Sequence, residues 1–209
     1  MNISEEDKGR RTQAERRAAT RRVLLEAARS LFAEKGYHET AAEEIVRRAG
    51  VTRGALYHYF EDKKDLFRAV VDEMEGEIDL EIEEAERAES GLPEAVMAGY
   101  RAFIDAVLDP EMRRTFFLDG TSVLGWEWRE IDARHAVGKI EEGLETLIGE
   151  GLIEPQPVKP LARLINGALL EAAFFVAASD DPEAARDEVW AGMERLLDGL
   201  MNRSSPAQR

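Results

Sequence analysis

The sequence contains no cysteine, so no disulfide framework, thiolate metal site or cysteine nucleophile is available to the protein. This absence argues against redox chemistry. Proline is sparse, with 7 among 209 residues, and aromatic residues make up only 7% of the chain. The first twenty residues lack an apolar segment, and no stretch approaches the roughly 18 apolar residues of a membrane span. We therefore expect a cytoplasmic protein with no membrane partner.

The abundant residues are Ala, Glu, Leu and Arg, which favour helix over strand. Because apolar positions recur at helical spacing, we predict an all-α protein of about nine helices. The Gly- and Pro-rich segments 119–125 and 149–160 are predicted loops. The predicted helices cover residues 20–35, 41–48, 53–60, 63–88, 93–109, 112–118, 126–148, 161–178 and 182–201.

Charge is distributed unevenly along the chain, although the whole chain carries a net −15. Residues 1–71 hold 15 Lys and Arg against 12 Asp and Glu, a net charge of +3, whereas residues 72–209 carry −18. The positive end is either a solvated, frayed leader or an arm that follows DNA. Because the acidic remainder repels phosphate, the distribution favours a site-specific DNA binder that docks in one orientation.

Residues 41–60 have the pattern of a helix-turn-helix. Thr40 and Glu43 predict a capping box at the start of the first helix, and Gly50 permits a tight reversal after it. Thr52 is the predicted cap of the second helix, and Asp62 that of the helix after it. In this geometry the second helix can enter a DNA major groove, although similar helix pairs also occur as plain scaffolding.

The side chains of the second helix suit DNA. Arg53 can bridge the two major-groove acceptors of guanine, and the small Gly54 lets the backbone approach the duplex. Tyr57 can bond phosphate or cover a thymine methyl, although it can equally pack in a core. We predict that DNA is contacted by Thr40, Thr52, Arg53, Gly54, Ala55, Tyr57, His58, Tyr59 and Lys63.

The segment LFAEKGYHETAAEEIVRRAGVTRGALYHYFEDKKDLF resembles the DNA-binding domain of the TetR family of bacterial repressors. The resemblance covers about residues 20–71 and rests on GY after the first helix, AGVT at the turn, LYxxF, and Lys63. It implies a non-enzymatic, ligand-released repressor that binds a palindromic operator as a homodimer. The chain departs from the family pattern at Ala41, Ala42, Val46 and Tyr59, so a phosphate contact at the start of the first helix would fall to Thr40 or to helix N–H groups.

For the second half the resemblance implies a ligand buried among the middle helices and dimerisation through the last two. Residues 164–178 are apolar nearly all round and need cover on every face, which a partner subunit or a monomer core would provide. We predict an arm at 1–19, a DNA-binding domain at 20–66, a ligand-binding and dimerisation domain at 67–202, and a disordered tail at 203–209. The predicted dimer interface comprises Gly167, Ala168, Ala172, Phe175, Val189, Met193, Leu196, Leu197 and Leu200.

No cofactor is expected, and the unknown effector is predicted to be an apolar or aromatic small molecule. Asp132 and His135 have a metal-like spacing, but no second ligand cluster accompanies them, so no metal is predicted. Two other function classes remain as alternatives: a helical enzyme using Asp132, His135 and Glu171, or an adaptor binding protein through the acidic half. The predicted pocket residues, each of which can also be plain core, are Met97, Tyr100, Phe103, Phe116, Trp126, His135 and Asn166.

Overall fold

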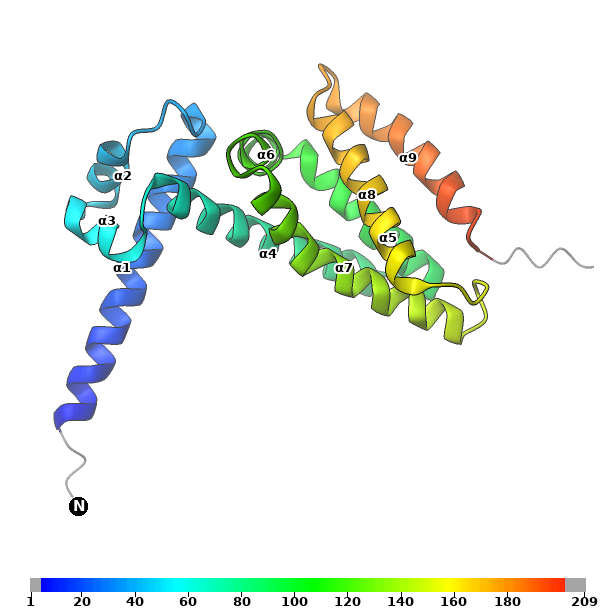
Figure 1. Cartoon of the computed structure of the whole chain (residues 1–209), viewed down its shortest axis with the longest axis horizontal. Coiled ribbons are helices and arrows are strands. Elements are labelled where there is room, and N and C mark those ends of the chain that lie inside the picture. The colour runs from blue at the N-terminus through cyan, green and yellow to red at the C-terminus, as the bar shows by residue number, and fades with distance from the viewer. Residues whose placement is uncertain (1–4, 202–209) are drawn as a thin grey trace, which may run out of the picture. The chain divides into compact units, whose positions relative to one another are not determined.

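The computed structural model describes the backbone of residues 5–201 and the side chains of residues 13–201 (Figure 1). The described chain is helical, as predicted, and its single β-type pairing is a bridge between Ile153 and Met201. It divides into two compact units, Met1–Val71 and Asp72–Arg209. The described α-helices are α1 (Glu5–Lys35), α2 (Ala42–Ala49), α3 (Arg53–Tyr59), α4 (Lys63–Ala88), α5 (Leu92–Asp105), α6 (Gly120–Leu124), α7 (Trp126–Gly149), α8 (Val158–Ala177) and α9 (Pro182–Asp198).

The first unit consists of α1, α2, α3 and the start of α4. Its core is apolar and aromatic: Ile45 and Leu56 are fully buried, and Phe32 packs edge-on against Phe67 with ring centroids 5.0 Å apart. The predicted boundary between the domains, at residue 66, falls within α4, which runs on from the first unit into the second.

Helix α1 begins at Glu5 and not at residue 20, so much of the predicted arm is helical. The residues between these points include no proline and are rich in Arg, Glu and Ala, which allow a helix to continue outward from its buried part. The predicted disordered tail at 203–209 lies outside the described residues.

In the second unit α8 is the central helix and packs against α5, α7 and α9 (Figure 1). Among the described helices, α8 alone is long and apolar enough to cross a membrane by length and composition. The expectation that no stretch approaches this length is therefore wrong for α8. Its composition follows from its position, because a helix with neighbours on several sides buries apolar side chains on several faces.

The segment between α5 and α7 is more regular than predicted. A 3₁₀ turn (Ala106–Leu108) is followed by a π-helix (Met112–Asp119), and α6 then occupies most of the predicted loop at 119–125. The Trp128 indole lies 2.8 Å from where a Cβ on Gly120 would be. A side chain at Gly120 would collide with Trp128 of α7, so glycine at this position allows the two segments to pack closely. A glycine in this segment therefore need not indicate a loop.

Candidate nucleic-acid interface and ligand cavity

The turn between α2 and α3 has the predicted geometry. Gly50 adopts the left-handed conformation with φ 66° and ψ 28°, and the Val51 N–H donates to the Val46 carbonyl at 3.0 Å. The Thr52 hydroxyl oxygen accepts a hydrogen bond from the Ala55 N–H at 3.2 Å. These caps start α3 directly after the turn.

Helix α3 presents an exposed face held in place by a buried one. Leu56 and the C-cap residue Phe60 anchor the helix in the core of the first unit. Tyr57 is 44% exposed, so the alternative of a core-packing tyrosine is excluded. Of the predicted contact residues on this segment, Thr52, Arg53, Gly54, Tyr57 and His58 are exposed, whereas Ala55 and Tyr59 are half-buried.

The Arg53 guanidinium has two partners within the first unit. Its Nη1 lies 3.0 Å from Glu43 Oε1 on α2, and its Cζ lies 5.5 Å from the centroid of the Tyr57 ring. The local pattern around Glu43 predicts a capping box and gives no sign of the pairing with Arg53, because the two residues lie on different helices. Together these contacts hold the guanidinium at the exposed start of α3.

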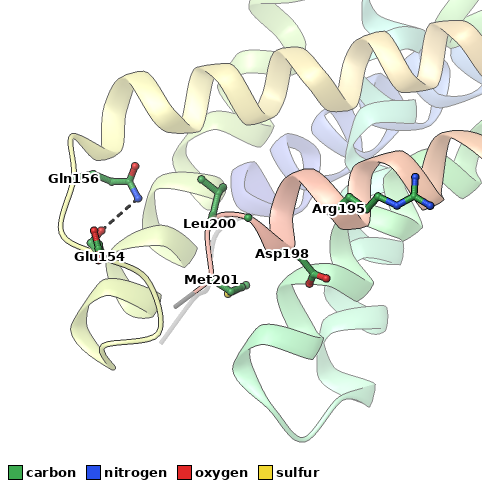
Figure 2. A pocket seen from close by; sticks show the side chains of 7 residues that line it. Glu154, Gln156, Arg195, Asp198, Leu200 and Met201 are labelled. Atoms are coloured by element: carbon green, nitrogen blue, oxygen red, sulfur yellow. Dashed lines mark hydrogen bonds between the residues drawn. The ribbon is translucent and has the colours of Figure 1, made fainter. Parts of the chain in front are cut away.

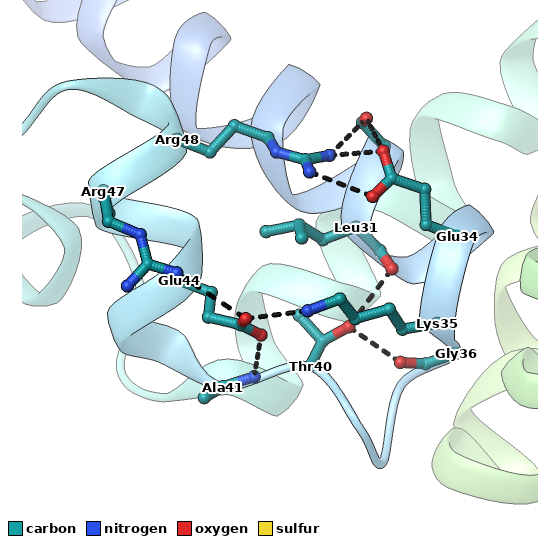
Figure 3. A network of polar contacts seen from close by, with 10 residues as sticks. Leu31, Glu34, Lys35, Gly36, Thr40, Ala41, Glu44, Arg47 and Arg48 are labelled. Carbon is teal, nitrogen blue, oxygen red and sulfur yellow. Dashed lines mark hydrogen bonds and ion pairs between the residues drawn. The ribbon is translucent and has the colours of Figure 1, made fainter.

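Thr40 does not have the predicted role. It is buried, and its hydroxyl donates to the Gly36 carbonyl at 2.8 Å, with the Leu31 carbonyl at 3.2 Å (Figure 3). Because α2 begins at Ala42, Glu44 and not Glu43 accepts from the backbone N–H of the residue before the helix. The capping box predicted for Thr40 and Glu43 is therefore wrong, and the Thr40 hydroxyl is used within the protein.

Lys63 is tied to the loop between α1 and α2. Its ammonium donates to the carbonyls of Tyr37 at 2.8 Å and Thr40 at 2.9 Å, and lies 4.0 Å from the Tyr37 ring centroid. Partial burial lowers the pKa of Lys63. Two of its three N–H groups are thus used within the protein, and one remains for a phosphate. The main role of Lys63 in the free protein is therefore to fasten the α1–α2 loop to the start of α4.

Ion pairs join α1 to α2 beside this loop (Figure 3). The Arg48 guanidinium contacts Glu34 at 2.6 and 2.9 Å and lowers the pKa of that carboxyl. Lys35 contacts Glu44 at 2.7 Å with the same effect on the pKa of Glu44. These charges are committed to holding the helices together.

A cavity of about 60 Å³ lies in the second unit among α4, α5, α7 and α8. Three of the predicted pocket residues, Tyr100, Phe103 and Asn166, line it. Burial raises the pKa of Tyr100, so its phenol stays protonated at neutral pH. The lining also includes Asp79, Ile82, Glu86, Val96, Gly99, Ala136, Lys139, Ile140, Gly143 and Leu169.

The other predicted pocket residues lie elsewhere. Met97 lines a smaller space of about 10 Å³ that it shares with Tyr100. Phe116 is fully buried in an aromatic cluster, 4.9 Å from Phe117 between centroids, and Trp126 is 73% exposed. His135 is paired through Nδ1 with Asp79 at 2.7 Å. The sequence shows which of these residues are apolar or aromatic and that they lie on helices. It does not show which face of each helix turns toward the cavity.

The predicted dimer residues on α8 and α9 divide by exposure. Phe175 is 58% and Leu196 65% exposed, and Leu164, which sequence reasoning missed, is 71% exposed. Gly167, Ala168, Val189 and Leu200 are half-buried. Ala172, Met193 and Leu197 are buried within their own unit and leave little surface for contact with a second copy.

A broader hollow of about 810 Å³ lies between the α7–α8 connector and the end of α9 (Figure 2). Its walls are largely polar, and the Gln156 amide donates to the Glu154 carbonyl across one side at 3.3 Å. Leu200, a predicted dimer residue, lies on its edge beside Met201, the last described residue.

The residues of the alternative enzyme hypothesis do not form one site. Asp132 is buried and accepts from the Asn166 amide at 2.8 Å, whereas Glu171 is exposed on α8. Within residues whose side chains are described, no group of three or more His, Asp or Glu is arranged to hold a metal ion.

Both parts of the chain match models of known domains. Residues 24–70 match "Bacterial regulatory proteins, tetR family", and residues 93–200 match "Tetracyclin repressor-like, C-terminal domain". The two matches include α2 and α3 in the first case and the cavity-lining parts of α5, α7 and α8 in the second.

Individual relatives cover most of the chain or its first unit. The transposon Tn10 TetC protein of Escherichia coli is 29% identical over 78% of this chain and 82% of its own length. The transcriptional repressor BepR of Brucella suis is 48% identical over 62 residues, which are 30% of this chain and 29% of that protein. A crystal structure of a TetR-family transcriptional regulator from Pectobacterium atrosepticum is 34% identical, with a TM-score of 0.83 over 90% of this chain and 97% of that one.

Proposed function

Since the chain belongs to the TetR family of helix-turn-helix transcriptional regulators, we propose that it is a ligand-released repressor that binds a palindromic operator as a homodimer. The family consists of regulators and not of enzymes. The similarity of the first unit to a protein named as a repressor supports the direction of control.

The observation that carries the proposal is the exposed Arg53 at the capped start of α3. Buried Leu56 and Phe60 fix the orientation of this helix, so the exposed face that it presents is preorganised. In the major groove the guanidinium would bridge O6 and N7 of a guanine, while Tyr57 and His58 would contact phosphates or a thymine methyl. The net positive charge of the first unit supports approach to DNA by this end of the chain.

Dimerisation is supported by the large apolar side chains left exposed on α8 and α9. Leu164, Phe175 and Leu196 are each more than half exposed, and a second copy of the chain would remove them from water. A dimer carries two α3 helices, and we expect an operator with one half-site for each, about one helical turn of DNA or roughly 34 Å apart.

Ligand control is supported by the cavity among α4, α5, α7 and α8. Its volume of about 60 Å³ is well below the roughly 300–1,000 Å³ of common ligand sites. A ligand would therefore have to widen it, and α4 continues from the cavity to Lys63 in the first unit. The ligand would favour a conformation in which the α3 helices no longer match the half-sites.

The experiment is selection of duplexes from a random library with the purified full-length protein, followed by fluorescence anisotropy on the selected and shuffled sequences at two salt concentrations. We expect a palindrome with half-sites about one turn apart, and a salt-dependent preference for it. A monomeric protein with no sequence preference at low ionic strength would refute the proposal.

A further inference from the structure

Two carboxyl groups are buried in the second unit, Glu75 on α4 and Asp132 on α7. Glu75 is 2% exposed and Asp132 1% exposed. Glu75 lies between Asp72 and Asp79 on α4, and these two aspartates pair with Arg134 at 3.0 Å and His135 at 2.7 Å on α7. The two carboxyl groups thus lie within the same contact between helices, on its buried side.

Neither carboxyl group has its hydrogen bonds satisfied. Glu75 Oε2 and Asp132 Oδ1 are buried without a partner, and the Asn166 amide donates only to Asp132 Oδ2. Buried carboxylates in proteins are normally paired with a cation or with several donors. Glu75 and Asp132 are near enough for the charge of Asp132 to act on Glu75. Two such groups, each with an oxygen that has no partner, indicate a site built for a ligand that supplies positive charge and hydrogen-bond donors.

The neighbouring side chains do not provide this positive charge. Burial raises the pKa of Glu75 well above its ordinary value, and the negative charges of Asp132, Asp79 and Asp72 raise it further, against a smaller opposite effect of Lys139. Lys139 itself contacts Asp79 and Glu83, each at 3.0 Å. Burial likewise raises the pKa of Asp132 to about 6, although Asn166, Arg129 and His135 oppose it.

The two carboxyl groups adjoin the cavity through neighbouring residues that line it. Asn166, which donates to Asp132, also lines the cavity, as does Asp79, one helical turn beyond Glu75 on α4. On the other side, Trp128 lies one turn before Asp132 on α7, and its indole N–H is also buried without a partner. Aromatic rings surround the region, since Phe103 of the cavity packs on Phe117 and Trp128 lies 5.2 Å from Phe116 between centroids.

We propose that the effector is an organic cation: its ammonium or amidinium group lies between Glu75 and Asp132, and its flat apolar body lies against Tyr100 and Phe103. The cation supplies the donors that the two carboxyl oxygens lack, and the aromatic rings cover its body and stabilise its charge. The inference rests on the proposed function only in treating the bound cation as the effector.

Calorimetric titration of the full-length protein with matched probes tests the chemistry. The probe pairs are benzamidine with benzamide and tryptamine with indole-3-ethanol, which share a body and differ in charge, at pH 8 where Asp132 is ionised. At least one cation should bind about tenfold or more tightly than its neutral partner. Glu75→Gln and Asp132→Asn should each remove this preference, whereas Glu130→Gln, an exposed carboxyl on α7, should keep it.

Folding is checked separately by thermal unfolding, in which Glu75→Gln should melt no lower than the natural protein because it replaces a buried carboxyl group whose ionisation is unfavourable there. Equal binding of each cation and its neutral partner, no binding of either cation at millimolar concentration, or an unchanged preference in both variants would overturn the proposal. Operator binding is measured in parallel. A cation that binds with the expected preference but leaves operator affinity unchanged supports the site chemistry and contradicts only the effector role in the proposed function.

Discussion

Arg53 on α3 and Glu43 on α2 form an ion pair, with 3.0 Å between Nη1 and Oε1, at the surface that we assign to DNA. Both side chains are well exposed, at 66% and 60%, so the pair stabilises the free protein by about 0–1 kcal/mol. A bidentate guanine contact discriminates by about 1–3 kcal/mol. Exchange of Glu43 for a guanine edge is therefore favourable, and the glutamate keeps the guanidinium oriented until DNA arrives.

Arg53→Ala should relax base preference at one position in each half-site by about 1–3 kcal/mol, because it removes a base contact and leaves the phosphate contacts in place. Anisotropy titrations on the operator and on single-base variants measure this. Arg129→Ala removes the same charge from an exposed position of the second unit and should leave the preference unchanged. Equal losses of affinity on operator and shuffled DNA would contradict the assigned role.

Lys63→Met should lower the free energy of unfolding by about 1–2 kcal/mol, because the carbonyls of Tyr37 and Thr40 both lose a charged donor. Urea unfolding in the absence of DNA checks this. Arg47→Met also removes a cation, but Arg47 is 75% exposed and its Nη2 makes a long ion pair of 3.6 Å with Glu44 Oε1. The free energy of unfolding should therefore change by no more than about 0.5 kcal/mol. Equal free energies of unfolding for the two variants would contradict the stabilising role assigned to Lys63.

Gly50→Ala should destabilise the protein by about 1–2 kcal/mol, because φ of 66° strains any residue with a Cβ. Gly76→Ala is the matched control, since it lies in the middle of α4 with open space at its Cβ. That substitution should stabilise by about 0.5–1 kcal/mol through helix propensity. Thermal unfolding of both variants should therefore shift in opposite directions, and shifts of the same sign would contradict the strain argument.

Asp132→Asn should change the pH dependence of stability. Burial raises the pKa of Asp132 from 3.8 to about 6, so in this window the folded protein holds a proton that the unfolded chain has released. The free energy of unfolding that this proton contributes is complete below pH 3.8 and is lost as the pH rises through about 6. The loss is about 3 kcal/mol. The variant should lack this decline and should be more stable at pH 8. Parallel unfolding curves for both proteins across the window would refute the assignment.

Phe175→Glu should produce a monomer, because it places a charge on the exposed apolar face of α8. Sedimentation analysis gives the oligomeric state, and affinity for a palindrome should fall much more than affinity for an isolated half-site. Leu80→Glu introduces the same charge at a leucine that is 62% exposed on α4, and it should remain a dimer. If the Phe175→Glu protein remained a dimer, the interface could not lie on this face of α8.

Local signals in the sequence were reliable where neighbours in the chain decide the structure. Gly50, Thr52 and Asp62 cap and turn the chain as predicted, since their hydrogen bonds reach only a few residues along the backbone. Where two similar starts compete, the local signal was ambiguous. Both Glu43 and Glu44 can cap α2, and the structure selects Glu44 by burying Thr40 in the loop that Lys63 holds.

The sequence by itself determined most of the helices, the turn before α3 and the segregation of charge between the two units, because periodicity, capping and composition are properties of short segments. It did not place the start of α1 or predict α6. Only the tertiary structure decided which side chains meet across helices. It exposed Trp126, buried Phe116, paired Arg53 with Glu43, and buried Glu75 and Asp132 with an oxygen of each left without a partner. The physical reason is that the direction a helix face points, and what it packs against, depends on residues far away in the chain.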